Sequence, residues 1–278
     1  MWSRLLQGLR QRREAAAVAR KPIPDLLWRR TLKRFPFLPR AGTADEALLR
    51  RMTSLFLDRK EFSGAHGLVI SDDMAVAIAA QACLPVLRMD LDAYQGFVGV
   101  VVHPGLARAR RSFADNDGVV HEFEETLSGE ALEGGPVMLS WRDVRSAGAR
   151  AAQGYNVVIH EFVHVLDMAD GLADGLPLLP TDISRREWCA GLDAAYQAFF
   201  HAVDSGAPTA LDPYGAESPS EFFAVASEAF FVAPQVLQAD HPAVYGLLMR
   251  YFRQDTLARL QQAPLTAPTE PQEEAPRA

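Results

Sequence analysis

Apolar residues recur at helical spacing in the first third of the chain. Thr43 and Glu46 stand three residues apart, as in a capping box that closes the start of a helix. The apolar residues that follow recur at every third or fourth position and predict a helix with one buried face. They are Leu48, Leu49, Met52, Leu55 and Phe56. Ser71 is placed to begin a second helix that runs through Ala82.

Shorter apolar runs in the middle of the chain predict strands. These runs are Pro85–Leu87, Phe97–Val102 and Val137–Trp141. Two longer apolar stretches follow, at 156–171 and 219–231, and both are typical of buried helices. The expected order is helix, helix, sheet, helix, helix. This is an α+β fold, mainly helical, with a small mixed sheet next to the helix at 156–171.

The first long apolar stretch contains His160-Glu161-Phe162-Val163-His164, an HExxH motif. Residues four apart on an α-helix lie one above the other, so both imidazoles can reach one metal ion. Glu161 lies beside them, where its carboxylate can take the proton of a zinc-bound water that attacks a carbonyl. Two imidazoles and a carboxylate are costly to bury without a partner, which favours a zinc site over two ordinary core histidines.

A catalytic zinc needs a third protein ligand and keeps its fourth position open. The second apolar stretch offers two candidates, because Glu221 and Glu228 are seven residues apart and share one helical face. We expect one of them to bind zinc and the other to accept a hydrogen bond from a ligand histidine. The residues alone do not assign the two roles. The alternative for both is a salt bridge or contact with solvent.

Two further polar residues lie at spacings that suit the same site. Asp167, three residues after His164, is expected to orient an imidazole; the alternative is that it ends the helix on the solvent side. Tyr214 precedes Glu221 by seven residues in a turn-rich segment. Its phenol is a candidate hydrogen-bond donor to the oxyanion of a tetrahedral intermediate. Packing is the alternative role for a tyrosine in a loop.

Three segments resemble the Mlc titration factor A family of bacterial zinc metallopeptidases. They are Cys83–Leu87, Asn156–Gly171 and Tyr214–Phe231. The resemblance extends over about residues 25 to 260, and its two later segments are far more specific than HExxH alone. It implies a zincin-like fold of the gluzincin type, similar to the catalytic domain of anthrax lethal factor, with one zinc ion per chain.

The resemblance also implies roles for the residues singled out above. By this similarity the zinc ligands would be His160, His164 and Glu221. Glu161 would be the general base and Tyr214 the oxyanion donor. Glu228 would then lie behind a ligand histidine, in the same kind of role as Asp167.

The activity that the family implies is aminopeptidase-like hydrolysis of peptide bonds. The family name also points to binding of a sugar-responsive transcriptional repressor, Mlc or a protein like it. The alternative is a non-catalytic regulatory protein that contains zinc and binds its partner elsewhere. Zinc-dependent hydrolysis of a non-peptide amide is a third possibility that the ligands do not exclude.

The strand expected just before the motif is the candidate for binding substrate backbone. In zincins, which this chain resembles, an edge strand near the metal pairs with extended substrate, and such pairing gives affinity with little demand on sequence. The candidate residues are Val137, Met138, Leu139, Ser140 and Trp141. An ordinary buried strand is the alternative.

Length and composition indicate one domain with irregular ends. The chain has 278 residues, of which 49% are hydrophobic, enough for one substantial core. We expect a single domain over 25–261, a basic flexible arm over 1–24 and a disordered tail, rich in Pro and Glu, over 262–278. The first 40 residues hold 11 Lys or Arg against 2 Asp or Glu. Such a local excess suits contact with nucleic acid, an anionic membrane surface or an acidic partner; the alternative is a solvated arm.

The remaining composition narrows the class of protein. The net charge of −7 argues against direct binding of nucleic acid by the body of the chain. The sequence shows neither an apolar run of transmembrane length nor the pattern of a secretory signal. Two cysteines, Cys83 and Cys189, suit a reducing compartment better than a disulfide framework. We therefore expect a cytoplasmic protein.

Overall fold

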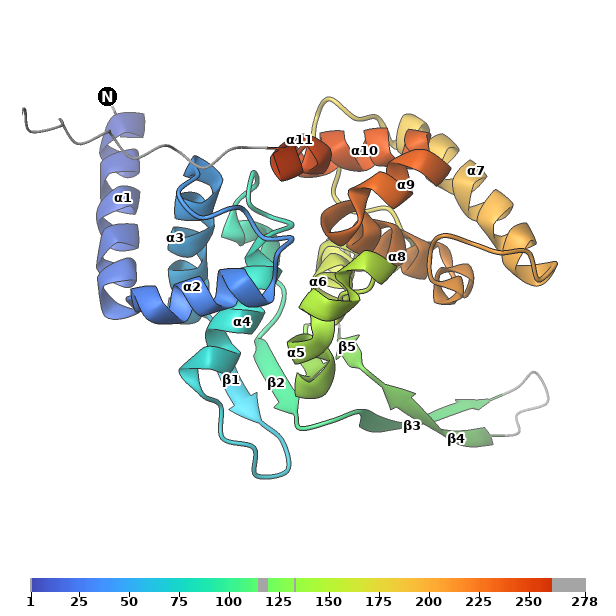
Figure 1. The fold of residues 1–278 in the computed structure, drawn as a ribbon, viewed down its shortest axis with the longest axis horizontal. Coiled ribbons are helices and arrows are strands. Elements are labelled where there is room, and N and C mark those ends of the chain that lie inside the picture. The colour runs from blue at the N-terminus through green and yellow to red at the C-terminus, as the bar shows by residue number, and fades with distance from the viewer. Residues whose placement is uncertain (1, 115–119, 133, 262–278) are drawn as a thin grey trace, which may run out of the picture.

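The computed structural model describes residues 2–114, 120–132 and 134–261. Helices α1 to α4 form one side of the molecule and α7 to α11 the other, with α5 and α6 between them (Figure 1). The amino-terminal helices are α1 (Trp2–Arg20), α2 (Asp25–Arg34), α3 (Ala44–Arg59) and α4 (Asp72–Cys83). The central and carboxyl-terminal helices are α5 (Trp141–Arg150), α6 (Val157–Asp167), α7 (Arg185–Asp204), α8 (Pro219–Val232), α9 (Pro234–Asp240), α10 (Pro242–Phe252) and α11 (Thr256–Gln261).

A small mixed sheet lies against α6. Its strands are β1 (Glu61–Gly64), β2 (Gly99–His103), β5 (Gly129–Ala131) and β6 (Val137–Ser140), in the spatial order β1-β2-β6-β5. Strands β1, β2 and β6 are parallel, whereas β5 runs antiparallel to β6. Two further strands, β3 (Ala107–Ala114) and β4 (Val120–Leu127), pair with each other as a hairpin (Figure 1). The structure thus confirms a mainly helical α+β fold with a small mixed sheet.

The helix starts read from the sequence form as expected at α3 and α4. The Thr43 hydroxyl accepts a hydrogen bond from Glu46 N at 3.2 Å, and Ser71 caps α4 through Met74 N at 3.3 Å. The Glu46 carboxylate turns to Gly42 N and to the Trp28 indole rather than to Thr43 N. The reciprocal half of the capping box is therefore replaced by contacts with the preceding turn and α2.

The prediction of a strand at Pro85–Leu87 is wrong. This segment is a turn directly after α4, with Leu87 N donating to Leu84 O at 3.3 Å. Its side chains are buried, so the apolar run marks burial and not pairing in the sheet. The carbonyl groups of Leu84 and Pro85 accept from Gln254 Nε2 at 2.9 and 3.1 Å, which satisfies the buried backbone without a neighbouring strand.

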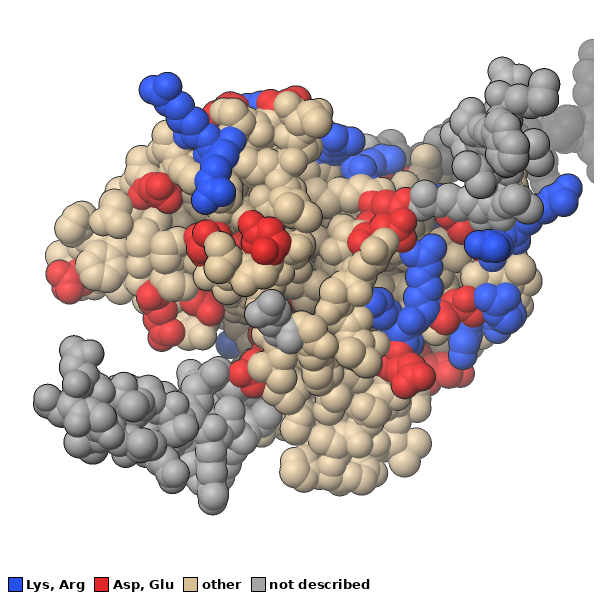
Figure 2. Space-filling model, turned by 180° about the vertical axis from the view of Figure 1, so that it is seen from behind, with Lys and Arg blue, Asp and Glu red and all other residues tan. Residues whose placement is uncertain are grey.

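The amino-terminal segment also differs from the expected flexible arm over 1–24. Residues 2–20 form α1, and its carboxyl-terminal half packs on α3 with Ala17 buried. Ion pairs join Arg20 to Asp58 at 2.6 Å and Arg51 to Glu14 at 3.0 Å. Basic and acidic side chains interleave on this side of the molecule (Figure 2), so acidic partners offset much of the local basic charge. The tail predicted to be disordered, 262–278, lies outside the described residues.

Helix α6 is held at the centre of the molecule by its apolar face. The Phe162 ring lies 5.6 Å from that of Phe56, 5.1 Å from Tyr94 and 5.4 Å from Phe97, in edge-to-face arrangements. The opposite side of α6 faces β5 and α8. This packing fixes both the height and the rotation of the helix that carries the HExxH motif.

Two compositional expectations concern the whole fold. Both cysteines are free thiols; Cys83 is buried, which raises the pKa of its thiol, and Cys189 is half-buried. Within the part of the chain that the structure describes, no helix is both long and apolar enough to cross a membrane.

Candidate metal centre

The start of α6 is fixed by Asn156. Its side-chain oxygen accepts from Ile159 N at 3.0 Å, and its amide nitrogen donates to Gln81 Oε1 of α4 at 2.9 Å. Because this cap sets the first turn, His160 and His164 fall on the side of the helix that faces α8 and β5. A local helix signal in the sequence thus places both imidazoles.

The start of α8 brings the first carboxylate to them. Ser218 caps this helix by accepting from Glu221 N at 3.1 Å, so Glu221 lies in the first turn. Its Oε2 atom is 3.0 Å from His160 Nε2 and 3.3 Å from His164 Nε2, and the two Nε2 atoms are 3.1 Å apart. Two imidazole nitrogens and one carboxylate oxygen therefore converge on one point.

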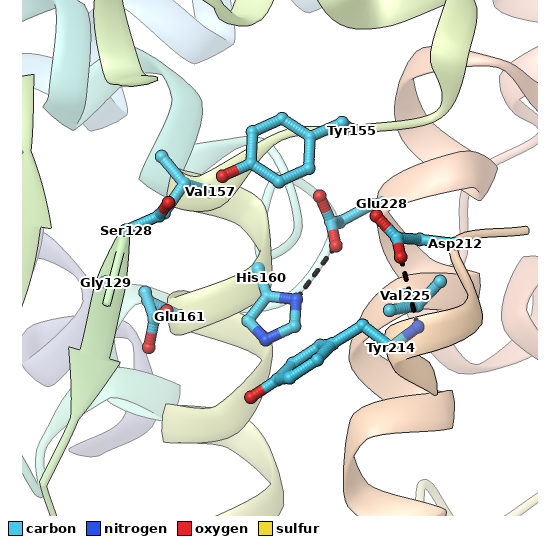
Figure 3. A pocket seen from close by; sticks show the side chains of 10 residues that line it. All are labelled: Ser128, Gly129, Tyr155, Val157, His160, Glu161, Asp212, Tyr214, Val225 and Glu228. Atoms are coloured by element: carbon cyan, nitrogen blue, oxygen red, sulfur yellow. Dashed lines mark hydrogen bonds and ion pairs between the residues drawn. The ribbon is translucent and has the colours of Figure 1, made fainter. Parts of the chain in front are cut away.

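Glu228 lies on the other side of His160. Its Oε1 atom is 2.8 Å from His160 Nδ1 (Figure 3). Its second oxygen accepts from the backbone N–H of Asn156. When the proton of the neutral ring is on Nδ1 and shared with this carboxylate, the Nε2 atom carries a free lone pair. Glu228 thus turns His160 toward the point where the other two acceptors meet.

His164 is oriented through a hydroxyl group. The Ser220 hydroxyl donates to Asp167 Oδ2 at 2.6 Å, so it accepts from His164 Nδ1, which is 3.1 Å away. Asp167 is fully buried and also accepts from Gly175 N at 3.0 Å. Asp167 therefore reaches His164 by way of Ser220, and the solvent-facing alternative does not hold for it.

The three convergent atoms are all acceptors, and this arrangement fits a cation. Burial lowers the pKa of His160, but its hydrogen bonds to Glu221 and Glu228 outweigh burial and raise it well above the usual value. Burial opposes ionisation of Glu221 as well, yet the two histidines lower its pKa to about 2. Both shifts reflect a proton held between the histidines and Glu221, and a metal ion can take the place of that proton. Among the described residues, these three form the one such group of potential ligands.

Glu161 lies beside the convergence point and under strand β5. Its side chain is buried, and burial raises its pKa to about 7, against the opposing effect of the two histidines. A Cβ atom added at Gly129 of β5 would lie 2.4 Å from Glu161 Oε1 and 2.7 Å from its Cδ. The space for this carboxylate therefore depends on a glycine in the neighbouring strand.

Tyr214 lies in a short 3₁₀ helix, Pro213–Ala216, that precedes α8. Asp212 caps this turn by accepting from Tyr214 N at 3.0 Å. The Tyr214 ring is 6.0 Å from the ring of His160 and partly exposed, and the two side chains lie next to each other in the pocket (Figure 3). The structure thus brings Tyr214 to the same pocket as His160 and Glu161.

The expectation that Val137–Trp141 is an edge strand for substrate is wrong. Strand β6, Val137–Ser140, pairs with β2 on one side and β5 on the other, so its backbone groups are already used in the sheet. Val137, Leu139 and Ser140 are buried, and Trp141 begins α5. The ordinary buried strand was the correct alternative. The edge of the sheet beside His160, His164 and Glu221 is β5, which the sequence analysis missed.

Other residues of the centre were also missed. Ser220 joins His164 to Asp167, and its position directly after Pro219 in a buried helix was the available signal. Tyr155, from the loop before α6, lines the same pocket as His160 and Glu228 (Figure 3). Gly129 had no recognisable signal, because its role comes from contact with Glu161 across the fold.

Fold and site together define a class of protein. A helix with two histidines four apart, packed on a small mixed sheet and facing a helix that supplies a carboxylate, is typical of metallopeptidases. Residues 9–253 match the family described as glucose-regulated metallo-peptidase M90, which makes this chain a metallopeptidase by family.

Curated relatives identify the family more closely. A Mlc titration factor A of Pectobacterium atrosepticum is 34% identical over 229 residues, covering 81% of this chain and 85% of the relative. The Mlc titration factor A of Serratia proteamaculans is 35% identical over 230 residues, covering 81% of this chain and 86% of the relative. That of Yersinia pestis is 33% identical over 252 residues, covering 87% of this chain and 90% of the relative. The chain belongs to the Mlc titration factor A family.

Proposed function

We propose that this chain is a zinc-dependent peptidase whose metal ligands are His160, His164 and Glu221. The observation that carries the proposal is the convergence of three acceptor atoms within 3.3 Å of one another, next to the buried carboxylate of Glu161. Two imidazoles and one carboxylate form a donor set that zinc uses in peptidases, with a position left for water. Bound zinc would polarise the substrate carbonyl and acidify water.

The chain's own residues supply the remaining chemistry. Glu161, with a pKa of about 7, accepts a proton from the attacking water and returns it to the leaving amine. Tyr214 donates a hydrogen bond to the oxygen on which negative charge develops. Glu228 and Asp167 hold the rings of His160 and His164 in the required orientation, the second through Ser220.

Strand β5 is the proposed binding edge for the substrate backbone. It is an edge strand of the sheet, and residues 129–132 line the hollow in front of His160 and His164. An extended peptide added to this edge would place a carbonyl between the metal ligands and Tyr214. Main-chain pairing of this kind would let the site accept different sequences.

Removal of amino-terminal residues and binding of a repressor are the finer parts of the proposal. Aminopeptidase action follows from the resemblance, and Mlc binding from the name that the relatives carry. We propose a transcriptional repressor of the Mlc type as partner. The alternative is a regulatory binding protein in which zinc has no catalytic role.

Metal removal separates these functions. Protein treated with a chelator and then restored with zinc should lose and regain hydrolysis of aminoacyl anilides and short peptides. Metal content and rate are measured on the same samples, with zinc alone as the blank. A protein that contains zinc but hydrolyses none of these substrates, and that keeps repressor affinity after chelation, would support the non-catalytic alternative.

Ser220→Ala is expected to weaken zinc affinity by about 10–100-fold, the usual effect of removing a group that orients a ligand histidine. The hydroxyl joins His164 Nδ1 to the buried Asp167, so its loss frees the ring and leaves that carboxylate with fewer donors. Competition against a metal-sensing dye measures the affinity. Ser205→Ala, at an exposed position after α7, is the matched control, and equal affinities for the two variants would contradict this role.

Gly129→Ala is expected to lower kcat by about 100-fold. The added methyl group would lie too close to the Glu161 carboxylate and would push it out of its present position. Metal content should stay at the wild-type level, since the three atoms nearest to the new group all belong to Glu161 and not to a proposed ligand. Gly105→Ala is the control, because a Cβ there meets nothing within 4 Å. An unchanged kcat for Gly129→Ala would show that Glu161 has room to move.

A further inference from the structure

The pocket that contains His160 and Glu161 extends beyond the proposed catalytic residues. It has a volume of about 300 Å³, which is room for one amino-acid side chain. Figure 3 shows the side chains that surround it. We call it the valine pocket; the further residues of its lining include Ser128, Tyr155, Val157, Asp212 and Val225.

The valine pocket and the hollow in front of His160 and His164 open toward opposite ends of α6. Both contain His160 and Tyr214, so they meet at the proposed metal centre. The hollow in front continues to Met168, about one turn past His164. The valine pocket continues to Val157, about one turn before His160. A substrate carbonyl at the metal centre therefore has one of these spaces on each side.

Strand β5 gives the direction of a bound peptide. Its first residue, Gly129, lines the valine pocket, whereas Leu132, directly after the strand, lines the hollow that contains Met168. A peptide that adds to β5 in the antiparallel sense, the commoner and more stable pairing, runs from Leu132 toward Gly129. Its amino end then lies toward Met168, and the valine pocket receives the side chain of the residue that follows the cleaved bond. This direction agrees with the proposed removal of amino-terminal residues.

The valine pocket combines apolar side chains with an acidic wall. Val157 and Val225 are buried aliphatic residues. Asp212 and Glu228 lie next to each other in the pocket (Figure 3). Burial raises the pKa of Glu228, and the negative charge of Asp212 adds to this increase, so the two carboxylates repel each other. None of the ten lining residues is Lys or Arg. An aliphatic stem that ends in a cation suits both parts of such a pocket.

Of the two carboxylates, Asp212 is the one that a bound cation can reach. Glu228 is buried, and its oxygens are used by His160 Nδ1 and by the backbone N–H of Asn156. Asp212 is exposed, and its Oδ1 atom accepts from Tyr214 N at 3.0 Å. A carboxylate has about four acceptor positions on its two oxygens. Asp212 can therefore accept from an ammonium or guanidinium group and still cap the turn that carries Tyr214.

We infer that Asp212 selects a Lys or Arg side chain at the substrate position directly after the cleaved bond. The inference rests on the proposed peptidase function and names its class of substrate: peptides with a free amino end and a basic second residue. The stem of that residue lies against Val157 and Val225, and its cation meets Asp212 with the charge of Glu228 behind it.

Three tripeptide amides with free amino ends test the inference on zinc-loaded full-length protein: Ala-Lys-Ala, Ala-norleucine-Ala and Ala-Glu-Ala. Norleucine has an aliphatic stem like that of Lys but no ammonium group. We expect kcat/KM to be about 10-fold higher for the Lys peptide than for the norleucine peptide, and lowest for the Glu peptide. Mass spectrometry of the products confirms which bond is cleaved.

Asp212→Asn should bring the ratio of kcat/KM for the Lys and norleucine peptides to about 1, because the charge that attracts the ammonium group is lost. The Asn oxygen can still cap Tyr214 N, so the turn should be kept. Asp193→Asn, at an exposed position on α7 outside the pocket lining, is the matched control and should keep the wild-type ratio.

Equal kcat/KM for the Lys and norleucine peptides in the wild-type protein would overturn the inference, whether or not Asp212→Asn folds. A Lys preference that survives in folded Asp212→Asn would overturn it as well. So would a preference that appears only when Lys is the first residue, as in Lys-Ala-Ala amide. Each of these results leaves the peptidase intact. Absence of zinc-dependent hydrolysis of every peptide would overturn the proposed function and the inference together.

Discussion

Glu161→Gln is expected to keep the metal content of the wild-type protein and to lower kcat for peptide hydrolysis by about 10²–10⁴-fold, the usual contribution of a positioned general base. Gln has the size of Glu but cannot accept a proton from water. The substitution also replaces a buried carboxylate whose pKa is already raised to about 7 by burial, so the neutral side chain suits the site and folding should be preserved.

The measurement is kcat on samples with matched zinc content and matched thermal midpoints. Glu61→Gln on β1, at an exposed position, is the control for the same chemical change elsewhere, and its kcat should equal that of the wild type. A metal-loaded Glu161→Gln protein with undiminished turnover would reject Glu161 as the base. Loss of zinc from this variant would instead mean that Glu161 supports the ligands.

The sequence was sufficient for the helices that carry the site because their signals are local. Asn156 and Ser218 cap α6 and α8 within three residues of themselves, and the apolar spacing after each cap fixes which face is buried. When the two helices pack against each other, this packing alone brings His160 and Glu221 together. This is why the HExxH motif and a later acidic pair could be joined into one site.

The sheet could not be predicted in the same way, because strand order depends on contacts between distant segments. Val137–Ser140 has the apolar pattern of a strand, but its central place in the sheet comes from pairing with both β2 and β5. Strand β5 itself is three residues of Gly, Glu and Ala, with no alternation that identifies a strand. The edge that faces the proposed metal ligands was therefore assigned to the wrong segment.

The part played by Ser220 was equally hidden. A serine near the start of a helix is usually read as a cap, whereas here Ser218 is the cap and Ser220 links His164 to Asp167. Spacing placed Asp167 on the correct face of α6 but gave no indication that a hydroxyl from another helix lies between it and the imidazole. Such relays depend on tertiary contacts and become visible only in the folded chain.

Glu221 and Glu228 were equivalent candidates by spacing alone, and the fold separates them. Glu221 faces the Nε2 atoms of both histidines, whereas Glu228 faces His160 Nδ1, on the far side of the ring. We therefore expect Glu221→Gln to lose zinc on dialysis and to lose the zinc-dependent rise in thermal midpoint, because a neutral amide replaces one of three ligands. Glu228→Gln should retain zinc with about 10–100-fold lower affinity.

Zinc content by elemental analysis and thermal midpoints with and without added zinc measure both variants. Glu217→Gln, an exposed position four residues before Glu221, is the matched control and should behave as the wild type in both assays. Metal lost from Glu228→Gln but retained by Glu221→Gln would exchange the two roles. Metal retained by both variants would place the third ligand elsewhere. Because these substitutions change charge and not size, a difference between them reports which carboxylate meets the metal and not which helix packs better.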